Sequence, residues 1–388
     1  MAATTTGIPT YVYAVVFSSF CIVMGLLWDI MWHMSIGRDG LFSPPHLVIY
    51  VGALVSGLFS GYQILSMTLR KNHPDRPHSV RFWGIFYGSL GAMYCVWGAL
   101  AMLTSAPFDD WWHSTYGLDV EILTPPHSVL ALGMMMVQFG AIVGVLALQN
   151  TTSERDNSRA ATQSRWLFVI SAGLLQVVVS VLLAESLGKW ASHSSSYYIA
   201  GSLAFPLFLM AFGRASSLRY PITAVAAVYM ITYLLPNWIL PLFEATPKLG
   251  PVLNPITHYQ AFAFPMVLVV PAFALDLLCN RLSRSGKKLS DWWLAALAGL
   301  VFMGVFLAVQ WPFGSFLQES PYSRNWFFYT DAWSYNNDPT WEYRHKFAPW
   351  MAQTVPEFAL GFGKAILIAM FMSRIGLWWG NWMKRIVR

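Results

Sequence analysis

Apolar residues dominate this chain in long runs, and charged residues gather in the short segments between them. A helix needs about 20 consecutive apolar residues to cross the hydrocarbon core of a bilayer. The sixth run is short, and Pro236 and Pro241 interrupt the seventh. The ten runs that predict membrane-spanning helices are 11–32, 46–67, 82–103, 127–148, 166–184, 198–212, 222–243, 258–279, 292–310 and 356–376. The sequence therefore predicts an all-α fold, a polytopic membrane bundle of about ten transmembrane helices.

The composition supports a membrane location and argues against several other classes. Hydrophobic residues make up 56% of the 388 residues and charged residues only 11%, whereas soluble proteins carry about 25% charged residues. Aromatic residues reach 16%, which suits a chain with many membrane–water interfaces. A soluble enzyme, a nucleic-acid-binding protein and a disordered chain are all disfavoured. The three cysteines lie inside apolar runs without metal-type spacing and read as small core residues.

Lysine and arginine are distributed unequally between alternate loops, which predicts the orientation. One set of loops, together with the C-terminal end, holds 17 of these residues, and the opposite loops hold six. Cytoplasmic loops carry the excess of positive charge. We therefore expect a multi-pass protein of the inner (plasma) membrane with both termini in the cytoplasm.

A duplicated motif is the most informative feature of the sequence. Residues 28–46 read WDIMWHMSIGRDGLFSPPH, and residues 108–127 read FDDWWHSTYGLDVEILTPPH. Each copy closes a predicted pair of helices, with the pattern D-x3-H-x12-H in the first and D-x3-H-x13-H in the second. The residues of the pattern are Asp29, His33 and His46, and Asp109, His113 and His127. Helices one and two, and helices three and four, therefore look like two copies of one hairpin unit.

The spacing predicts that each hairpin brings its polar residues together. Residues four apart share a helix face, so each Asp should project beside the first His of its copy. A Pro-Pro pair suits the first turn of the returning helix, where a missing N–H costs nothing, and it places the second His near the same depth. One carboxylate and two imidazoles form a common ligand set for copper, zinc or iron. The alternative is that the Asp–His pairs are hydrogen-bonded groups that only hold each hairpin together.

The pattern D-x3-H-x12-H across a helical hairpin resembles the metal-binding motif in the C subunit of the copper membrane monooxygenases, the particulate methane and ammonia monooxygenases. The resemblance covers about 20 residues in each copy and implies copper bound by Asp29, His33 and His46. It extends less closely to Asp109, His113 and His127, because one extra residue separates the second pair of histidines and Asp110 competes with Asp109. That family's subunit is shorter, has one such motif and depends on partner subunits. We expect the first copy to bind metal better than the second.

Other polar residues in or near the apolar runs are weaker candidates. Fainter echoes of the motif occur in the next two external loops, and the tenth run places a carboxylate and an amine seven residues apart. The residues concerned are Glu185, His193, Glu244, His258, Glu357 and Lys364. The first four read as an additional polar site or as interfacial residues that cap helices. A charged group at membrane depth is costly, so Lys364 is expected to pair with Glu357, to reach the outer surface or to belong to a proton path.

The chain divides into three segments by these features. Residues 1–150 hold the duplicated hairpins, and residues 151–290 hold four helices with the fainter echoes. Residues 291–388 hold the last two helices and a long aromatic external loop at about 311–355. A loop of this length is typically either functional or disordered, and its aromatic content argues for order. We interpret it as a lid or docking surface, with an inert cap as the alternative.

Together these patterns favour an integral membrane metalloprotein with one or two Asp-His-His sites on its extracytoplasmic side. Copper is the favoured metal, iron and zinc are alternatives, and haem is disfavoured because a carboxylate four residues before the histidine has no role in haem ligation. The predicted activity is that of a monooxygenase-like oxidoreductase or a subunit of one, in contact with the lipid bilayer and other membrane subunits. The alternatives are an accessory or structural subunit of a respiratory or monooxygenase complex and, third, an ion or proton transporter.

Overall fold

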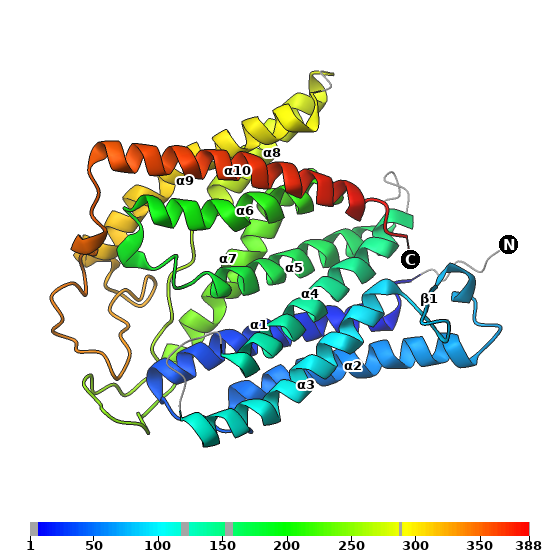
Figure 1. The fold of residues 1–388 in the computed structure, drawn as a ribbon, viewed down its shortest axis with the longest axis horizontal. Coiled ribbons are helices and arrows are strands. Elements are labelled where there is room, and N and C mark those ends of the chain that lie inside the picture. The colour runs from blue at the N-terminus through cyan, green and yellow to red at the C-terminus, as the bar shows by residue number, and fades with distance from the viewer. Residues whose placement is uncertain (1–6, 118–123, 152–157, 287–288, 388) are drawn as a thin grey trace. The chain divides into compact units, whose positions relative to one another are not determined.

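The computed structural model describes residues 7–117, 124–151, 158–286 and 289–387, and this part of the chain is predominantly helical (Figure 1). Its ten α-helices are α1 (Thr10–Ser35), α2 (Pro44–Leu69), α3 (Leu90–Tyr116), α4 (Pro125–Thr151), α5 (Arg159–Leu182), α6 (Ser195–Ala215), α7 (Pro221–Ile239), α8 (Val269–Arg284), α9 (Asp291–Glu319) and α10 (Val355–Met383). The short elements are η1 (Arg76–His78), β1 (Val80–Phe82), β2 (Phe86–Gly88), η2 (Lys189–Ala191), η3 (Leu240–Leu242), η4 (Pro321–Ser323) and η5 (Pro349–Met351). The two strands pair antiparallel, with Arg81 opposite Tyr87.

Nine helices of the described residues are long and apolar enough to span a membrane. They are α1 to α7, with η3 extending α7 to Leu242, and then α9 and α10. The predicted fold class, an all-α multi-pass membrane bundle, is confirmed. Four basic residues that enter the orientation count, Arg155, Lys287, Lys288 and Arg388, lie outside the described residues.

The eighth predicted span is wrong over its first half. Residues 258–267 are not helical, and α8 begins only at Val269 and has 16 residues. Pro265 lacks a backbone donor and disfavours helix at the residue before it. Buried side chains satisfy the irregular backbone, since the Phe262 N–H donates to Asn237 Oδ1 (2.7 Å) and the Val267 N–H donates to Gln310 Oε1 (3.2 Å). Such internal partners are what non-helical backbone requires at membrane depth.

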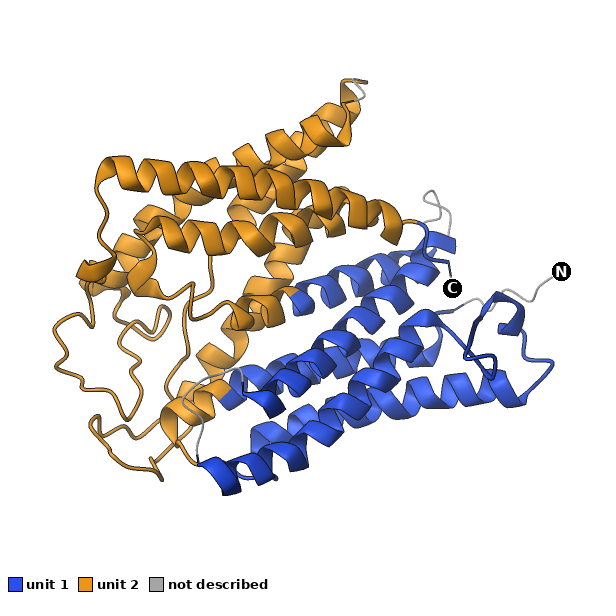
Figure 2. Ribbon diagram, viewed as in Figure 1, with its two compact units in different colours: residues 1–29, 39–175, 385–388 blue, residues 30–38, 176–384 orange. Residues whose placement is uncertain are grey.

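The described residues form two compact units, shown in separate colours in Figure 2. Unit 1 contains residues 1–29, 39–175 and 385–388, and unit 2 contains residues 30–38 and 176–384. Unit 1 therefore holds most of α1, all of α2 to α4 and the first part of α5. Unit 2 holds the end of α1, the rest of α5, all of α6 to α10 and the long loop.

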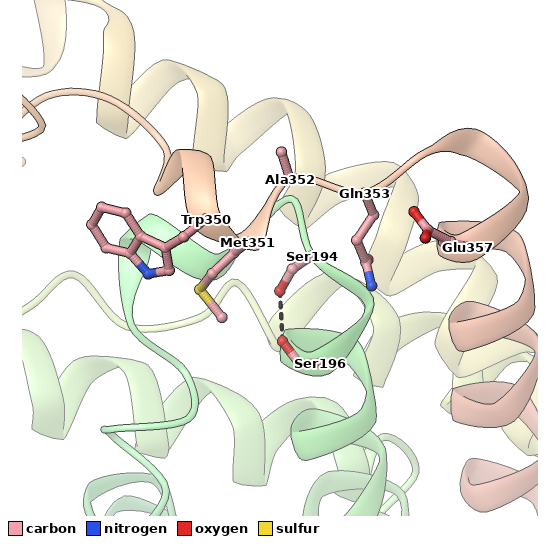
Figure 3. A pocket seen from close by; sticks show the side chains of 7 residues that line it. All are labelled: Ser194, Ser196, Trp350, Met351, Ala352, Gln353 and Glu357. Atoms are coloured by element: carbon pink, nitrogen blue, oxygen red, sulfur yellow. Dashed lines mark hydrogen bonds between the residues drawn. The ribbon is translucent and has the colours of Figure 1, made fainter.

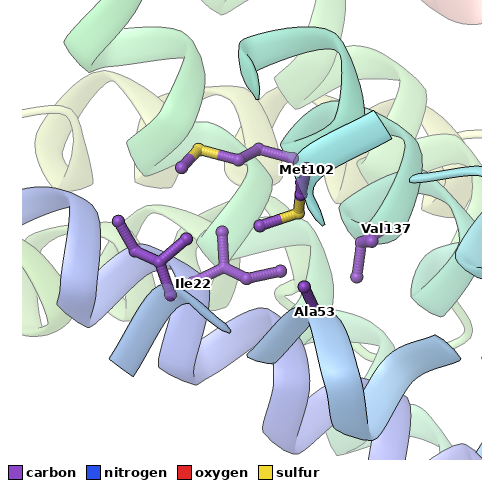
Figure 4. Packing of buried hydrophobic residues seen from close by; sticks show 6 residues of the cluster. Ile22, Ala53, Met102 and Val137 are labelled. Atoms are coloured by element: carbon purple, nitrogen blue, oxygen red, sulfur yellow. The ribbon is translucent and has the colours of Figure 1, made fainter. Parts of the chain in front are cut away.

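The core of unit 1 receives side chains from all four helices of the duplicated hairpins. Ile22 from α1, Ala53 from α2, Met102 from α3 and Val137 from α4 meet in one buried cluster (Figure 4). Each helix contributes a member of this cluster that lies seven residues, or about two turns, from a motif residue: Ile22 from Asp29, Ala53 from His46, Met102 from Asp109 and Met134 from His127. The cluster therefore forms an apolar floor beneath these four residues.

The two hairpins are duplicated in their packing as well as in sequence. A Cβ atom at Gly52 would lie 2.9 Å from the Ser18 carbonyl oxygen, and one at Gly133 would lie 2.8 Å from that of Gly98. Ser18 and Gly98 each lie eleven residues before the motif Asp, and Gly52 and Gly133 each lie six residues after the second motif His. Small residues let helix backbones approach closely in membranes. The equivalent contacts give both hairpins the same close crossing.

The long aromatic loop between the last two helices is shorter than predicted, because α9 continues to Glu319. Residues 320–354 pack within unit 2 around three tryptophans: Trp190 lies 5.8 Å from Trp333 and 5.9 Å from Trp341, between ring centroids. The loop also binds the end of α1, since the Tyr335 N–H (3.1 Å) and the Ser334 hydroxyl (3.0 Å) donate to the Met34 carbonyl. The aromatic residues of the loop therefore form an ordered cap on unit 2.

This aromatic cap encloses a cation whose titration gives a testable pH dependence. The Lys189 ammonium lies 5.3 Å from the Trp190 ring and 5.7 Å from the Trp333 ring. Burial, with a smaller effect of Arg344, lowers the pKa of Lys189 to about 8 from 10.5. Between these values the unfolded chain binds more protons than the folded one, so stability should rise with pH and level off above about 10.5.

We expect the thermal midpoint of the wild type to rise relative to that of a Lys189→Met variant as pH increases from 8 to 10.5. Calorimetry of both proteins in the same detergent measures this difference, in which the other titrating groups cancel. A difference in thermal midpoint that stays constant across this pH range would contradict a pKa of Lys189 that burial has lowered to about 8.

Candidate metal centres

The first motif brings one histidine and two carboxylates together where α1 and α2 approach each other. Pro44 and Pro45 form the first turn of α2 after the N-cap Ser43, and this turn places His46 beside Asp29. The His46 Nε2 atom lies 3.3 Å from Asp29 Oδ1 and 3.2 Å from Asp39 Oδ2. These three side chains can offer ligand atoms that all lie within 4.8 Å of one another.

A backbone carbonyl fixes the tautomer of His46. The His46 Nδ1 atom lies 3.0 Å from the Gly40 carbonyl oxygen, which can only accept a hydrogen bond. The Nδ1 atom therefore carries a proton, and the Nε2 atom faces the two carboxylates. A hydrogen bond from the second ring nitrogen to a carbonyl is the usual support of a metal-ligating histidine.

The second motif brings together all three residues that its spacing predicted. Asp109 lies near the end of α3, where its Oδ2 atom is 3.5 Å from His113 Nε2 and its Oδ1 atom is 3.4 Å from His127 Nε2. The two imidazole rings are 6.3 Å apart, and the ligand atoms again lie within 4.8 Å of one another. The Nδ1 atom of His113 lies 3.2 Å from the Gly117 carbonyl oxygen, so His113 has the same backbone support as His46.

Equivalent contacts bring the two helices of each hairpin close together next to the Asp and His residues. Four residues before Asp29, a Cβ atom at Gly25 would lie 3.1 Å from the Pro45 carbonyl oxygen. Four residues before Asp109, the buried Ser105 hydroxyl donates to the Pro126 carbonyl oxygen at 2.7 Å. A small residue one turn before each carboxylate thus lets the returning helix start close enough for its histidine to reach the carboxylate.

Tyr50 lies beside the first centre. Its ring is 6.1 Å from that of His46, and it packs against the apolar floor of unit 1. The first centre is therefore in contact, through Tyr50, with the cluster to which all four helices of the hairpins contribute.

Two details differ from the sequence expectation. His33 lies on α1 four residues after Asp29 and is exposed, and the first group of three contains Asp39 in addition to Asp29 and His46. Of the two adjacent acids in the second copy, Asp109 takes part in the group, and Asp110 is exposed and lies outside it.

Asp39 is the residue that reasoning from the sequence missed, although a signal for it was present. It lies two residues after Gly37, and the second copy has Asp119 at the same interval after Gly117. The motif therefore repeats as D-x3-H-x3-G-x-D before the Pro-Pro-His turn. Asp119 itself lies outside the described residues.

The residues of the fainter echoes have local contacts of different kinds. His193 is stacked between the rings of Trp311 (4.0 Å) and Phe347 (3.6 Å), and burial lowers its pKa. Glu244 and His258 form an isolated backbone bridge, and Glu185 is exposed. None of them joins a group of three metal-ligating side chains among the described residues.

The predicted pair of Glu357 and Lys364 does not form. The Glu357 carboxylate accepts hydrogen bonds from the Thr354 N–H (2.8 Å) and hydroxyl (2.7 Å), which completes a capping box at the start of α10. Lys364 is exposed and has no hydrogen bond or ion pair with any residue that the structure describes. The cap uses the carboxylate that the spacing had assigned to Lys364.

An open pocket of about 410 Å³ lies between the starts of α6 and α10 (Figure 3). Gln353 occupies part of this region and binds Ser195 through both its amide oxygen (2.8 Å) and its amide nitrogen (3.0 Å). Glu357 is the one ionisable residue in its lining, and it serves as the helix cap. The pocket therefore offers no cluster of ligating or catalytic groups.

The chain matches no protein-family model, no curated protein sequence and no solved structure.

Proposed function

We propose that this protein is an integral membrane metalloprotein whose two Asp–His centres each bind a transition-metal ion, with copper favoured and iron or zinc as alternatives. The observation that carries the proposal is the convergence of Asp109, His113 and His127 from α3 and α4. Two imidazoles and one carboxylate suit these metals and leave coordination positions open. The first centre offers one imidazole and two carboxylates in the same setting.

The surrounding residues have defined roles in this proposal. The Gly40 and Gly117 carbonyls orient His46 and His113 so that each Nε2 atom faces a carboxylate. Asp29, Asp39 and Asp109 balance the charge of a cation, and the apolar floor keeps water away from one side. Bound copper would supply redox chemistry, which means activation of dioxygen or relay of electrons.

The proposed activity is that of an oxidoreductase similar to the copper membrane monooxygenases, or of a subunit of such an enzyme. It is supported by the duplication of the ligand-bearing unit and by the resemblance of the first hairpin, in which Asp29 and His46 of the D-x3-H-x12-H pattern converge while His33 lies outside the group. The basic-residue count further supports a location in the inner (plasma) membrane, with both centres on the extracytoplasmic side and other membrane subunits as partners.

A non-catalytic accessory subunit is the second candidate. The contacts of His46 with two carboxylates, and of Asp109 with two histidines, could hold the hairpins together without a metal. A purely structural role predicts that these contacts affect stability alone. Metal analysis therefore separates the two candidates.

The test is to purify the protein in detergent, load it with Cu(II), remove excess metal and measure copper by mass spectrometry. We expect up to two copper ions per chain and electron paramagnetic resonance spectra with nitrogen hyperfine structure from imidazole. A protein that retains no stoichiometric copper, iron or zinc would leave the accessory-subunit candidate in place.

The Asp39→Asn variant tests the unexpected ligand of the first centre. Its carboxylate lies 3.2 Å from His46 Nε2, and its loss removes one anionic oxygen from a site that has only one imidazole in its group of three. We expect copper at the first centre to bind roughly tenfold or more weakly, with the second centre unchanged. Asp110→Asn, which alters an exposed acid outside either group, is the matched control.

A further inference from the structure

Exposed residues of α10 are regularly spaced along the face that does not pack on α6 and α9, and we call this row of residues the α10 seam. The exposed positions include Leu360, Lys364, Leu367, Phe371 and Trp378, and their intervals are multiples of alternating four- and three-residue steps. The apolar members are 57–67% exposed. A 3–4 alternation of this kind is the spacing with which one helix packs along another.

α10 is also the least covered of the nine candidate spans in the described residues. Only 17% of its apolar 18-residue stretch is buried, compared with 33–72% of the corresponding stretches of the other eight helices. Its opposite face packs on α6 and α9. A Cβ atom at Gly376 of α10 would meet the Leu207 carbonyl oxygen of α6. A Cβ atom at Gly299 of α9 would meet the backbone of Met370 of α10. The seam is therefore the free side of a helix that is firmly held on its other side.

Lys364 lies near the N-terminal end of this seam, four residues after Leu360, and within the apolar part of the helix. Trp378, Trp379 and Trp382, followed by Lys384 and Arg385, mark the other end as a membrane interface. A hydrocarbon core of about 20 helical residues then begins near residue 358, which puts Lys364 about six residues, or about 9 Å, inside it. A cation at such depth is costly unless it has a partner.

We propose that the α10 seam docks a transmembrane helix of a different protein, and that this helix presents an Asp or Glu side chain to Lys364. Charge complementarity selects this occupant. The acid on the same face, Glu357, serves as the helix cap, and Lys364 has no ionic partner among the described residues. A second copy of this chain is a poor occupant, since two parallel α10 helices would place one Lys364 against the other and like charges repel.

The experiment uses the full-length protein in its native membranes, with a photoreactive benzoylphenylalanine at Leu367. The same group at Leu58 of α2, which is 68% exposed and has no cation nearby on its face, is the control. We expect Leu367 to form an adduct with an apolar segment that contains an Asp or Glu, and Leu58 to label lipid.

Charge variants at Lys364 decide whether the cation carries the contact. Lys364→Glu should reduce the adduct roughly tenfold, Lys364→Arg should keep it, and exchange of the partner's acid for lysine should restore it in the Lys364→Glu background. Lys364→Met, which keeps the length and removes the charge, replaces Lys364→Glu if that variant has a lowered thermal midpoint.

Three results would overturn the proposal: lipid adducts alone at Leu367, an adduct between two copies of this chain, or a protein adduct that none of the charge variants changes. The first would mean that Lys364 reaches lipid headgroups along the helix. The proposal is independent of the metal centres, because copper binding to unit 1 is measured separately in the same variants.

Discussion

Replacement of His113 by alanine should remove copper from the second centre while leaving the first loaded. His113 supplies one of two imidazole nitrogens in a group whose ligand atoms lie within 4.8 Å of one another. Loss of an outer partner of a metal ligand costs ten- to hundredfold in affinity, so loss of the ligand itself should cost more than about a hundredfold. Copper per chain should fall by one equivalent, as measured by mass spectrometry after dialysis against a weak chelator.

The two centres should also differ from each other. Copper(II) binds imidazole nitrogen more strongly than carboxylate oxygen. The second group holds two imidazoles, whereas the first holds one. We therefore expect His113→Ala to lose the more tightly held ion and His46→Ala the weaker one, an order opposite to that expected from motif intervals alone. Tighter copper binding in His113→Ala than in His46→Ala would favour the interval-based order and a ligand role for His33.

A control histidine separates ligation from a general effect of losing an imidazole. His78 lies in η1, outside both groups, and His78→Ala should leave the copper content and its spectrum unchanged. If His113→Ala lowers the thermal midpoint but leaves the copper content at the wild-type value, the Asp109–His113 contact is structural and the second centre is not a metal site.

Hydropathy predicted most of the fold because membrane helices must satisfy their backbone internally over a fixed thickness. It failed at residues 258–267, where apolar side chains accompany an irregular backbone whose partners, Asn237 and Gln310, lie 25 and 43 residues away from the groups they bind. The residues around 258–267 do not indicate that side chains so far away in the sequence accept hydrogen bonds from this backbone. The first half of this hydrophobic run was therefore predicted to be helical, although α8 begins only at Val269.

The candidate centres were predictable to the extent that helix periodicity controls them. The i, i+4 spacing and the Pro-Pro turn predicted the second group completely, since each of its members lies on a regular helix. Asp39 was missed because it lies in the connection between helices, where the backbone has no fixed period. The Glu357–Lys364 pair was overpredicted, although Thr354-x-x-Glu357 is itself the sequence pattern of a capping box.

The close crossing of α3 and α4 should be as important to the second centre as its ligands. A Cβ atom at Gly98 would lie 2.7 Å from the Gly133 carbonyl oxygen and 2.9 Å from the Val137 backbone nitrogen. Backbone atoms cannot rotate away, so Gly98→Ala must push the two helices apart. We expect a loss of about 1–3 kcal/mol in unfolding free energy, the usual cost of overpacking.

The same displacement should weaken metal binding without altering any ligand. Asp109 and His127 lie on the two helices that Gly98 holds together. Asp109 is about three turns after Gly98 on α3, and His127 is about three turns before Val137 on α4. Gly61→Ala of α2 is the matched control, since nothing lies within 4 Å of its added Cβ atom. There the change should be neutral or stabilising by up to about 1 kcal/mol, because alanine has the better helix propensity. Equal thermal midpoints and equal copper contents for the two alanine variants would show that the centre does not depend on this helix crossing.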